Sequence, residues 1–276
     1  QWDQRGGGKT FFANDPEKVR PTMTVERFIA DGEAVVEHLC QLMGKRKLFL
    51  LGHSWGSFLG LALAARIPGR IAGYVGSGQI VHPAAHEAMA YDLVHAIAVR
   101  RGDKQAVDSL DAIPRPPSAP ADFVRHNRVI NLLYVKYMDE IYGGRAQKPN
   151  LIGAYWAALC SPEYSLRDVL NIHKGAGFCL QTMFGPDSVP GISAVRHVDV
   201  RQFGSRFQVP ILLFLGRHDY ACPSQPAADW LDTIEAPVKR LVWFEKSGHS
   251  PMIEEADLYA AALKGNLLRL ATDTGD

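Results

Sequence analysis

The chain has 276 residues, of which 47% are hydrophobic and 21% charged, with 25 glycines and 17 prolines. This composition is typical of a globular protein, and the length suits one large domain or a core domain with an inserted subdomain. Because 30 basic and 29 acidic residues leave a net charge of +1, electrostatics gives no reason to expect nucleic acid or an anionic membrane surface as a partner.

No apolar run approaches the roughly 18 residues that a membrane span requires, and nothing in the sequence indicates a metal or an organic cofactor. The cysteines are scattered without a CxxC spacing, so we expect buried free thiols rather than a disulfide framework. We expect a cytoplasmic location. The chain starts at Gln1 rather than Met, so we also expect that a segment upstream of it has been removed.

The first part of the chain predicts a parallel crossover unit. A helix is expected from Thr24, whose side chain can cap it, to Gly44, where it ends. Residues 47–51 form a short apolar run, typical of a strand buried on both faces. A helix over residues 58–66 and an apolar strand over residues 71–75 follow. Strand, helix and strand in this order predict parallel pairing with helices on both faces.

The same order returns near the C-terminus. Residues 210–216 and 240–244 read as strands, and residues 224–234 and 255–270 read as helices. Strands and helices alternate here, as in the first part of the chain. They therefore predict two further parallel strands.

Between these halves, the strand signal disappears. Helical patterns separated by proline-rich joints occur around residues 84–100, 122–142, 151–159 and 166–184. We therefore predict an α/β core formed by residues 1–80 and 207–276, with a helical lid inserted as residues 81–206.

A candidate nucleophile lies in residues 52–56 (GHSWG). The Gly-x-Ser-x-Gly pattern alone is weak, but here it lies directly between an apolar strand and a helix, where a nucleophile elbow occurs. Such a turn holds the serine in strained backbone space, and we expect a side chain at Gly52 or Gly56 to collide with the neighbouring chain. Ser54 is the predicted nucleophile. The backbone N–H of Trp55 is the predicted oxyanion donor.

A serine hydroxyl needs a base, and the base needs a group that holds its tautomer. Asp219 follows the strand at residues 210–216, and His249 follows the strand at residues 240–244. The carboxyl ends of parallel strands meet at one edge of a sheet, so both loops should open beside Ser54. The order serine, acid, histidine is the one that this kind of elbow requires.

Other titratable residues have ordinary structural interpretations. His218 is expected to make a structural hydrogen bond, and His53 to pack beside the elbow. His82 and His86 are four residues apart, but no third ligand has a useful spacing, so a surface face of the lid is expected rather than a metal site. Two alternative acids, Asp229 and Asp232, lie in a predicted helix and should face solvent.

Four motifs together carry a family resemblance: residues 3–6 (DQRG), 52–57 (GHSWGS), 216–219 (GRHD) and 247–249 (SGH). The chain resembles the α/β-hydrolase superfamily and, within it, the prolyl iminopeptidase-like group of serine peptidases and esterases. The resemblance implies a mostly parallel sheet flanked by helices, with an inserted helical lid. It covers the core, while the lid matches only in being helical.

Two features depart from that group. The resembling proteins have a His-Gly-Gly-Pro-Gly segment before the DQRG loop, and it supplies the second oxyanion donor. The resemblance therefore implies that this donor and the first strands of the sheet lie upstream of Gln1, in a missing N-terminal segment of the same polypeptide. The group also has a lid Trp followed closely by a Glu that binds the free amine of the substrate. The nearest match is Trp156 with the displaced Glu163, which are candidate substrate-binding residues; lid core and a helix start stay open as alternatives.

Three functions remain open. The first is an aminopeptidase that acts on small peptides or amides with an N-terminal proline or apolar residue. The second is a carboxylesterase that acts on small acyl esters through the same acyl-enzyme. The third is a ligand-binding homologue that retains the fold without turnover, because a fold does not imply a function.

Overall fold

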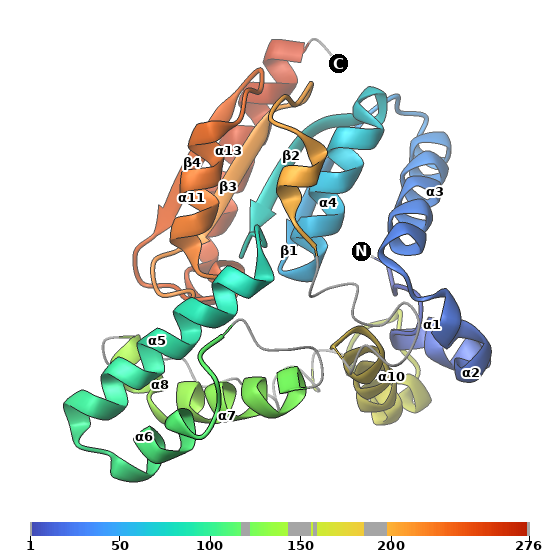
Figure 1. Ribbon diagram of the computed structural model, residues 1–276. Helices are drawn as coiled ribbons and strands as arrows, with labels where there is room; N and C mark the ends of the chain where they lie inside the picture. Colours follow the sequence, from blue (N-terminus) through green and yellow to red (C-terminus); the bar gives the residue numbers. More distant parts are fainter. Residues whose placement is uncertain (1, 117–121, 143–155, 157–158, 185–197, 275–276) are drawn as a thin grey trace. The chain divides into compact units, whose positions relative to one another are not determined.

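The computed structural model describes residues 2–116, 122–142, 156, 159–184 and 198–274. The chain divides into two compact units, which we call the smaller and the larger unit (Figure 1). The smaller unit comprises Gln1–Phe28, Ala119–Val124 and Gln147–Arg196, and the larger unit comprises Ile29–Ser118, Arg125–Ala146 and His197–Asp276. The boundaries that the sequence suggests for core and lid stay a prediction.

A parallel sheet forms the centre of the larger unit. Its described strands are β1 (Leu48–His53), β2 (Ile71–Ser77), β3 (Ile211–Gly216) and β4 (Lys239–Phe244), in the order β1-β2-β3-β4 with every pair parallel. The predicted parallel sheet of an α/β fold is therefore confirmed. Because all four strands run in one direction, the loops that follow them leave at the same edge.

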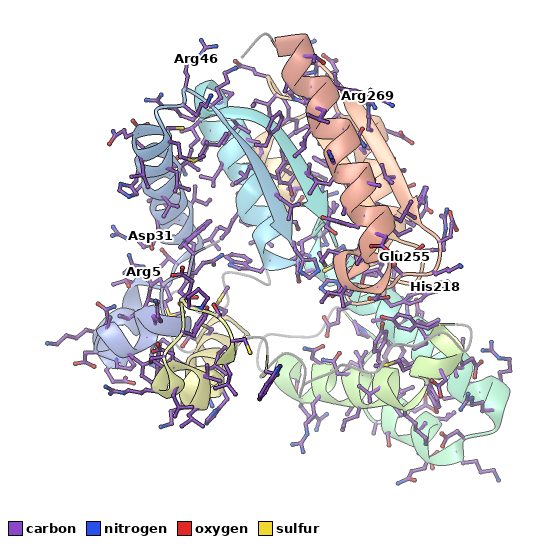
Figure 2. All side chains as sticks on the ribbon, turned by 180° about the vertical axis from the view of Figure 1, so that it is seen from behind. Arg5, Asp31, Arg46, His218, Glu255 and Arg269 are labelled. Carbon is purple, nitrogen blue, oxygen red and sulfur yellow. The ribbon has the colours of Figure 1, made fainter. Side chains whose placement is uncertain are left out.

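Helices cover both faces of this sheet (Figure 1). α4 (Trp55–Arg66) and α11 (Ser224–Thr233) lie on one face, and α13 (Ala256–Thr274) lies on the other, where Figure 2 shows it from behind. α3 (Val25–Met43) begins after Thr24, whose hydroxyl accepts the N–H of Arg27 at 3.2 Å, as the predicted cap requires. The core under α13 contains Val75, Leu212, Phe214, Phe244, Tyr259 and Leu270.

The expected burial of β1 on both faces is wrong. β2 and β3 are buried along almost their whole length, but β1 is mostly half-buried and Leu51 is 45% exposed. β1 and β4 are the outer strands of the described sheet, and β4 is likewise partly exposed. An apolar run reports a preference for burial, whereas the neighbours of a strand decide how much it is buried.

Four helices of the larger unit form a second core: α5 (Pro83–Arg101), α6 (Lys104–Asp111), α7 (Phe123–Lys136) and α8 (Met138–Ile141). Tyr91, Leu110, Ile130 and Tyr137 are among its buried members. The sequence predicts one helix over residues 122–142, but the structure breaks it at Tyr137. α6 is an additional helix, capped by the Asp103 carboxylate, which accepts the N–H of Ala106 at 3.2 Å.

The smaller unit contains α1 (Gly8–Ala13), α2 (Pro16–Val19) and α10 (Leu166–Phe184). Phe178 of α10 packs against Phe11 of α1, with ring centroids 5.4 Å apart. α10 has the predicted bounds, whereas the predicted helix at residues 151–159 falls mostly outside the described residues. Among the described residues, the 3-10 helices are Arg20–Thr22, Pro68–Arg70 and Val200–Phe203.

The described part of the chain contains no helix that is both long and apolar enough to cross a bilayer. The four cysteines are free. Cys40 and Cys222 are buried as expected, whereas Cys160 is exposed, so burial of all the thiols is wrong.

Candidate active site

Ser54 has a strained backbone. Its φ of 53° and ψ of −123° make it the one non-glycine residue with positive φ among those that the structure describes. Its N–H donates to the Ser77 carbonyl at 3.0 Å, and its own carbonyl accepts the N–H of Ser57 at 2.8 Å. A residue in this region costs about 1–3 kcal/mol and persists only where the surroundings hold it. Such strain is typical of a nucleophile elbow.

The glycines on either side of Ser54 differ. A Cβ at Gly52 would lie 2.3 Å from the carbonyl oxygen of Gly56, so glycine is required there. A Cβ at Gly56 would meet nothing within 4 Å. The prediction that a side chain at Gly56 collides with the neighbouring chain is therefore wrong, and the tight approach involves the backbone of Gly56 and the Cα of Gly52.

The structure joins two of the predicted site residues directly. His249 Nδ1 lies 2.9 Å from Asp219 Oδ2. A carboxylate can only accept, so Nδ1 carries the proton and Nε2 is left to accept one. The other oxygen of Asp219 accepts the backbone N–H of Cys222 at 2.9 Å. The side chain of Asp219 is fully buried, while that of His249 is 25% exposed.

Two opposing effects set the protonation of His249. Burial lowers the pKa of the imidazole, but the hydrogen bond that it donates to Asp219 and the charges of Asp219 and Glu254 raise it by more, so the pKa lies above its ordinary value. Both carboxylates therefore stabilise the imidazolium that forms when His249 takes a proton.

Cys222 connects Ser54 with the Asp219–His249 pair, and Gly78 lies against that pair. Burial and the charge of Asp219 raise the pKa of the Cys222 thiol well above its usual range, and a hydrogen bond with Ser54 offsets part of this. Gly78 follows β2 with a φ of 53°, and a Cβ there would lie 3.0 Å from His249 Cε1 and 3.4 Å from Asp219 Oδ2. The loops after β1, β2, β3 and β4 thus each bring a residue to this edge.

The remaining histidines surround the pair without replacing it. His53 packs beside the elbow as expected, with its Nε2 2.8 Å from the His249 carbonyl oxygen. The His218 ring stacks on Tyr142, with ring centroids 6.2 Å apart, and the backbone N–H of His218 donates to the Ser247 carbonyl at 2.9 Å. The structural hydrogen bond expected of its side chain stays a prediction.

His82 caps α5 by accepting the N–H of Ala85 at 3.2 Å. His86 is buried, so its expected place on a surface face is wrong. Its Nε2 has no partner among the described residues. Burial lowers the pKa of His86 to about 4, so this imidazole is uncharged at neutral pH.

The other predicted site residues have the following places. Trp55 is the first residue of α4, and its indole stacks on Phe58 with centroids 5.6 Å apart. Trp156 and Glu163 belong to the smaller unit, and Trp156 is 68% exposed. Lys9 Nζ donates to the Glu163 carbonyl at 2.8 Å, while the Glu163 side chain is exposed. The second oxyanion donor that the resemblance implies stays a prediction.

Sequence reasoning missed Gly78, Cys222 and Glu254. Gly78 could have been found, because it lies in the loop after the carboxyl end of a predicted strand, as Asp219 and His249 do. Cys222 acts through its backbone N–H as well as its thiol, and the Glu254 carboxylate accepts backbone N–H groups. Such roles leave no pattern in residue type. The predicted solvent exposure of Asp229 and Asp232 on α11 is confirmed.

Comparisons with known proteins agree with this fold. The family model described as the alpha/beta hydrolase fold matches residues 2–256. The chain is 28% identical over 263 residues to the probable aminopeptidase YbaC of Bacillus subtilis, covering 95% of the chain and 77% of that protein. It is 23% identical over 267 residues to a proline iminopeptidase of Saccharolobus solfataricus, covering 95% of the chain and 73% of that protein.

A solved structure gives the same result for the fold. The crystal structure of a proline iminopeptidase from Mycobacterium smegmatis matches with a TM-score of 0.61 and 18% identity, covering 94% of this chain and 76% of that one. At this identity the match concerns the fold alone.

Proposed function

Because the chain belongs to the alpha/beta hydrolase fold family, we propose that it is a serine hydrolase in which Ser54 is the nucleophile, His249 the general base and Asp219 the residue that orients the base. One observation carries this proposal. The hydrogen-bonded pair of Asp219 and His249 lies at the carboxyl edge of the sheet, where Ser54 occupies the strained turn between β1 and α4.

The reaction follows from these positions. The Ser54 hydroxyl oxygen bonds to the substrate carbonyl carbon while its proton passes to His249 Nε2, and the negative charge moves to the carbonyl oxygen. The N–H of Trp55, at the start of α4, is the proposed donor to that oxygen. Collapse breaks the bond to the leaving group, which takes the proton from His249. A water molecule, activated by the same imidazole, then releases the acyl group and restores Ser54.

We further propose that the substrate is a small peptide or amide with an N-terminal proline or apolar residue. The names of the two sequence relatives, a probable aminopeptidase and a proline iminopeptidase, support this substrate class. Trp156 and Glu163 are the proposed substrate-binding residues. A carboxylate in the role of Glu163 would bind the free amine of the substrate by a charge-assisted hydrogen bond.

The test is a panel of prolyl and other aminoacyl arylamides beside nitrophenyl esters of graded chain length. We expect arylamide turnover, and we expect Glu163→Gln to abolish it while ester turnover is kept. Glu17→Gln, an exposed carboxylate of the same unit, is the matched control and should keep both. Ester turnover alone would make the protein a carboxylesterase. If the protein turns over neither substrate class and Ser54 is not acylated, the protein is a ligand-binding homologue.

A further inference from the structure

Backbone amides make many of the contacts that hold the loop carrying His249. It has no regular secondary structure, so these N–H groups need acceptors from elsewhere. Among residues 246–250, Lys246 N–H donates to Glu255 at 3.0 Å, Ser247 N–H to the Phe244 carbonyl at 3.3 Å, Gly248 N–H to Glu254 at 2.6 Å, and Ser250 N–H to Glu254 at 3.0 Å.

Glu254 is distinct within this set. Its Oε2 accepts the N–H of Gly248 and its Oε1 accepts the N–H of Ser250, so one carboxylate binds the N–H groups of the residues on both sides of His249. Glu254 ends the short helix α12 (Pro251–Glu254), immediately after the loop. Hydrogen bonds to an ionised acceptor are about twice as strong as neutral ones. Two of them on one side chain fix both the place and the direction of the residue between them.

Tyr142 and Gly216 lie so close to Gly248 that this residue has no room to move toward them. A Cβ at Gly248 would lie 2.1 Å from the Tyr142 hydroxyl, and one at Gly216 would lie 1.9 Å from the Gly248 carbonyl oxygen. If the Glu254 contacts were lost, the peptide of Gly248 could not settle against these neighbours without moving His249.

We propose that Glu254 is a positioning residue for His249, which holds the two peptide N–H groups beside it and adds a negative charge that favours the imidazolium. This inference rests on the proposed function, in which His249 is the general base. It assigns Glu254 no contact with the substrate.

The titratable groups that face His249 come from several elements. Asp219 follows β3, Glu254 ends α12, His53 ends β1, His86 lies in α5 and Tyr142 follows α8. Burial lowers the pKa of both His53 and His86, and burial raises the pKa of Tyr142, so these three groups are uncharged near neutral pH. Asp219 and Glu254 are therefore the described side chains whose negative charge acts on the imidazole.

If Glu254 had a purely structural role, it would resemble Glu255. Glu255 accepts hydrogen bonds from the N–H of Lys246 and the hydroxyl of Ser247, which are farther along the chain from His249. Figure 2 labels Glu255, which directly precedes the first residue of α13. The two roles differ in one measurable respect. Loss of a structural contact lowers stability alone, whereas loss of the Glu254 charge also changes the protonation of His249.

The experiment compares Glu254→Gln, Glu254→Asp and the control Glu245→Gln in the whole chain. Glu245 makes an exposed ion pair with Arg217 at 2.7 Å, so its neutralisation removes the same charge without touching residues 248–250. The readouts are kcat and KM for the substrate found in the panel, the pH profile of kcat/KM, and the imidazole titration of His249 by NMR.

For Glu254→Gln we expect a kcat about tenfold lower, a KM within about twofold of wild type, and a His249 titration about half a pH unit lower. The glutamine side chain keeps one oxygen that can accept an N–H, but its NH₂ group faces the second of the two N–H groups, those of Gly248 and Ser250. Glu254→Asp keeps the charge but is one methylene shorter, so its kcat should fall severalfold while the titration stays. Glu245→Gln should match wild type in every readout.

A folded Glu254→Gln protein with wild-type kcat and titration would overturn the inference. Should that variant not fold, wild-type kcat in Glu254→Asp would overturn it equally. The NMR titration does not depend on turnover. A wild-type protein that hydrolyses nothing and is not acylated would therefore refute the proposed function, while the titration would still show whether Glu254 acts on His249.

Discussion

Gly78→Ala is expected to disable the site through a single added methyl group. Gly78 has a φ of 53°, and its Cβ would lie 3.0 Å from His249 Cε1 and 3.1 Å from Nδ1. Ordinary carbon contacts are about 3.5–4.0 Å. The imidazole must therefore retreat by about half an ångström, or the loop after β2 must move by a similar amount.

The magnitude follows from two separate effects. Alanine in left-handed backbone costs about 1–2 kcal/mol of stability, which corresponds to a fall in Tm of about 2–4 °C for each kcal/mol in a protein of this size. Displacement of a catalytic group by about 1 Å costs about 100-fold in rate. We therefore expect kcat/KM to fall about 10- to 100-fold, beyond what the stability loss explains.

Gly102→Ala separates the two effects. Gly102 ends α5 with a φ of 64°, and a Cβ there would meet nothing within 4 Å. Both variants should lose similar stability in thermal unfolding, but only Gly78→Ala should lose kcat/KM in ester or arylamide hydrolysis. If the two variants had equal kcat/KM, the contact between Gly78 and His249 would have no catalytic consequence and the reasoning would fail.

Three other outcomes are expected. Asp219→Asn should lower kcat about 10³- to 10⁴-fold, because an amide does not fix the Nδ1–H tautomer; Asp232→Asn, exposed on α11, is the control, and a loss below tenfold for Asp219→Asn would count against the triad. The pH profile of kcat/KM should show an acid limb above about 6.5, because the pKa of His249 is raised and activity is lost as the pH falls through it; a limb at pH 6 or lower would contradict this. Gly52→Ala should lower the free energy of unfolding in urea by about 3 kcal/mol, because its Cβ would lie 2.3 Å from backbone, whereas Gly56→Ala has open space; equal stabilities would disprove the difference.

The architecture of the larger unit could be predicted because its signals are local. The runs at β2 and β3 and the motif around Ser54 each depend on a few neighbouring residues. The resemblance to α/β hydrolases and to their prolyl iminopeptidase-like group is likewise confirmed. That Asp219 and His249 follow parallel strands was enough to place them at one edge, although the roles assigned to them stay predictions.

Other features depend on contacts that sequence does not contain. The exposure of β1 is set by its outer place in the described sheet, and the burial of His86 by how α5 packs. Glu254 binds backbone groups that every residue possesses, so no spacing reveals it. Trp156 and Glu163 stay predictions.

The central claim is that Ser54 is the nucleophile, and covalent labelling tests it most directly. The protein is incubated with a fluorophosphonate, its intact mass is measured, and the modified peptide is sequenced. We predict one adduct, on Ser54, that is absent from Ser54→Ala and forms much more slowly in Asp219→Asn. A folded, intact protein that takes up no label, or takes it up on another residue, would contradict the claim.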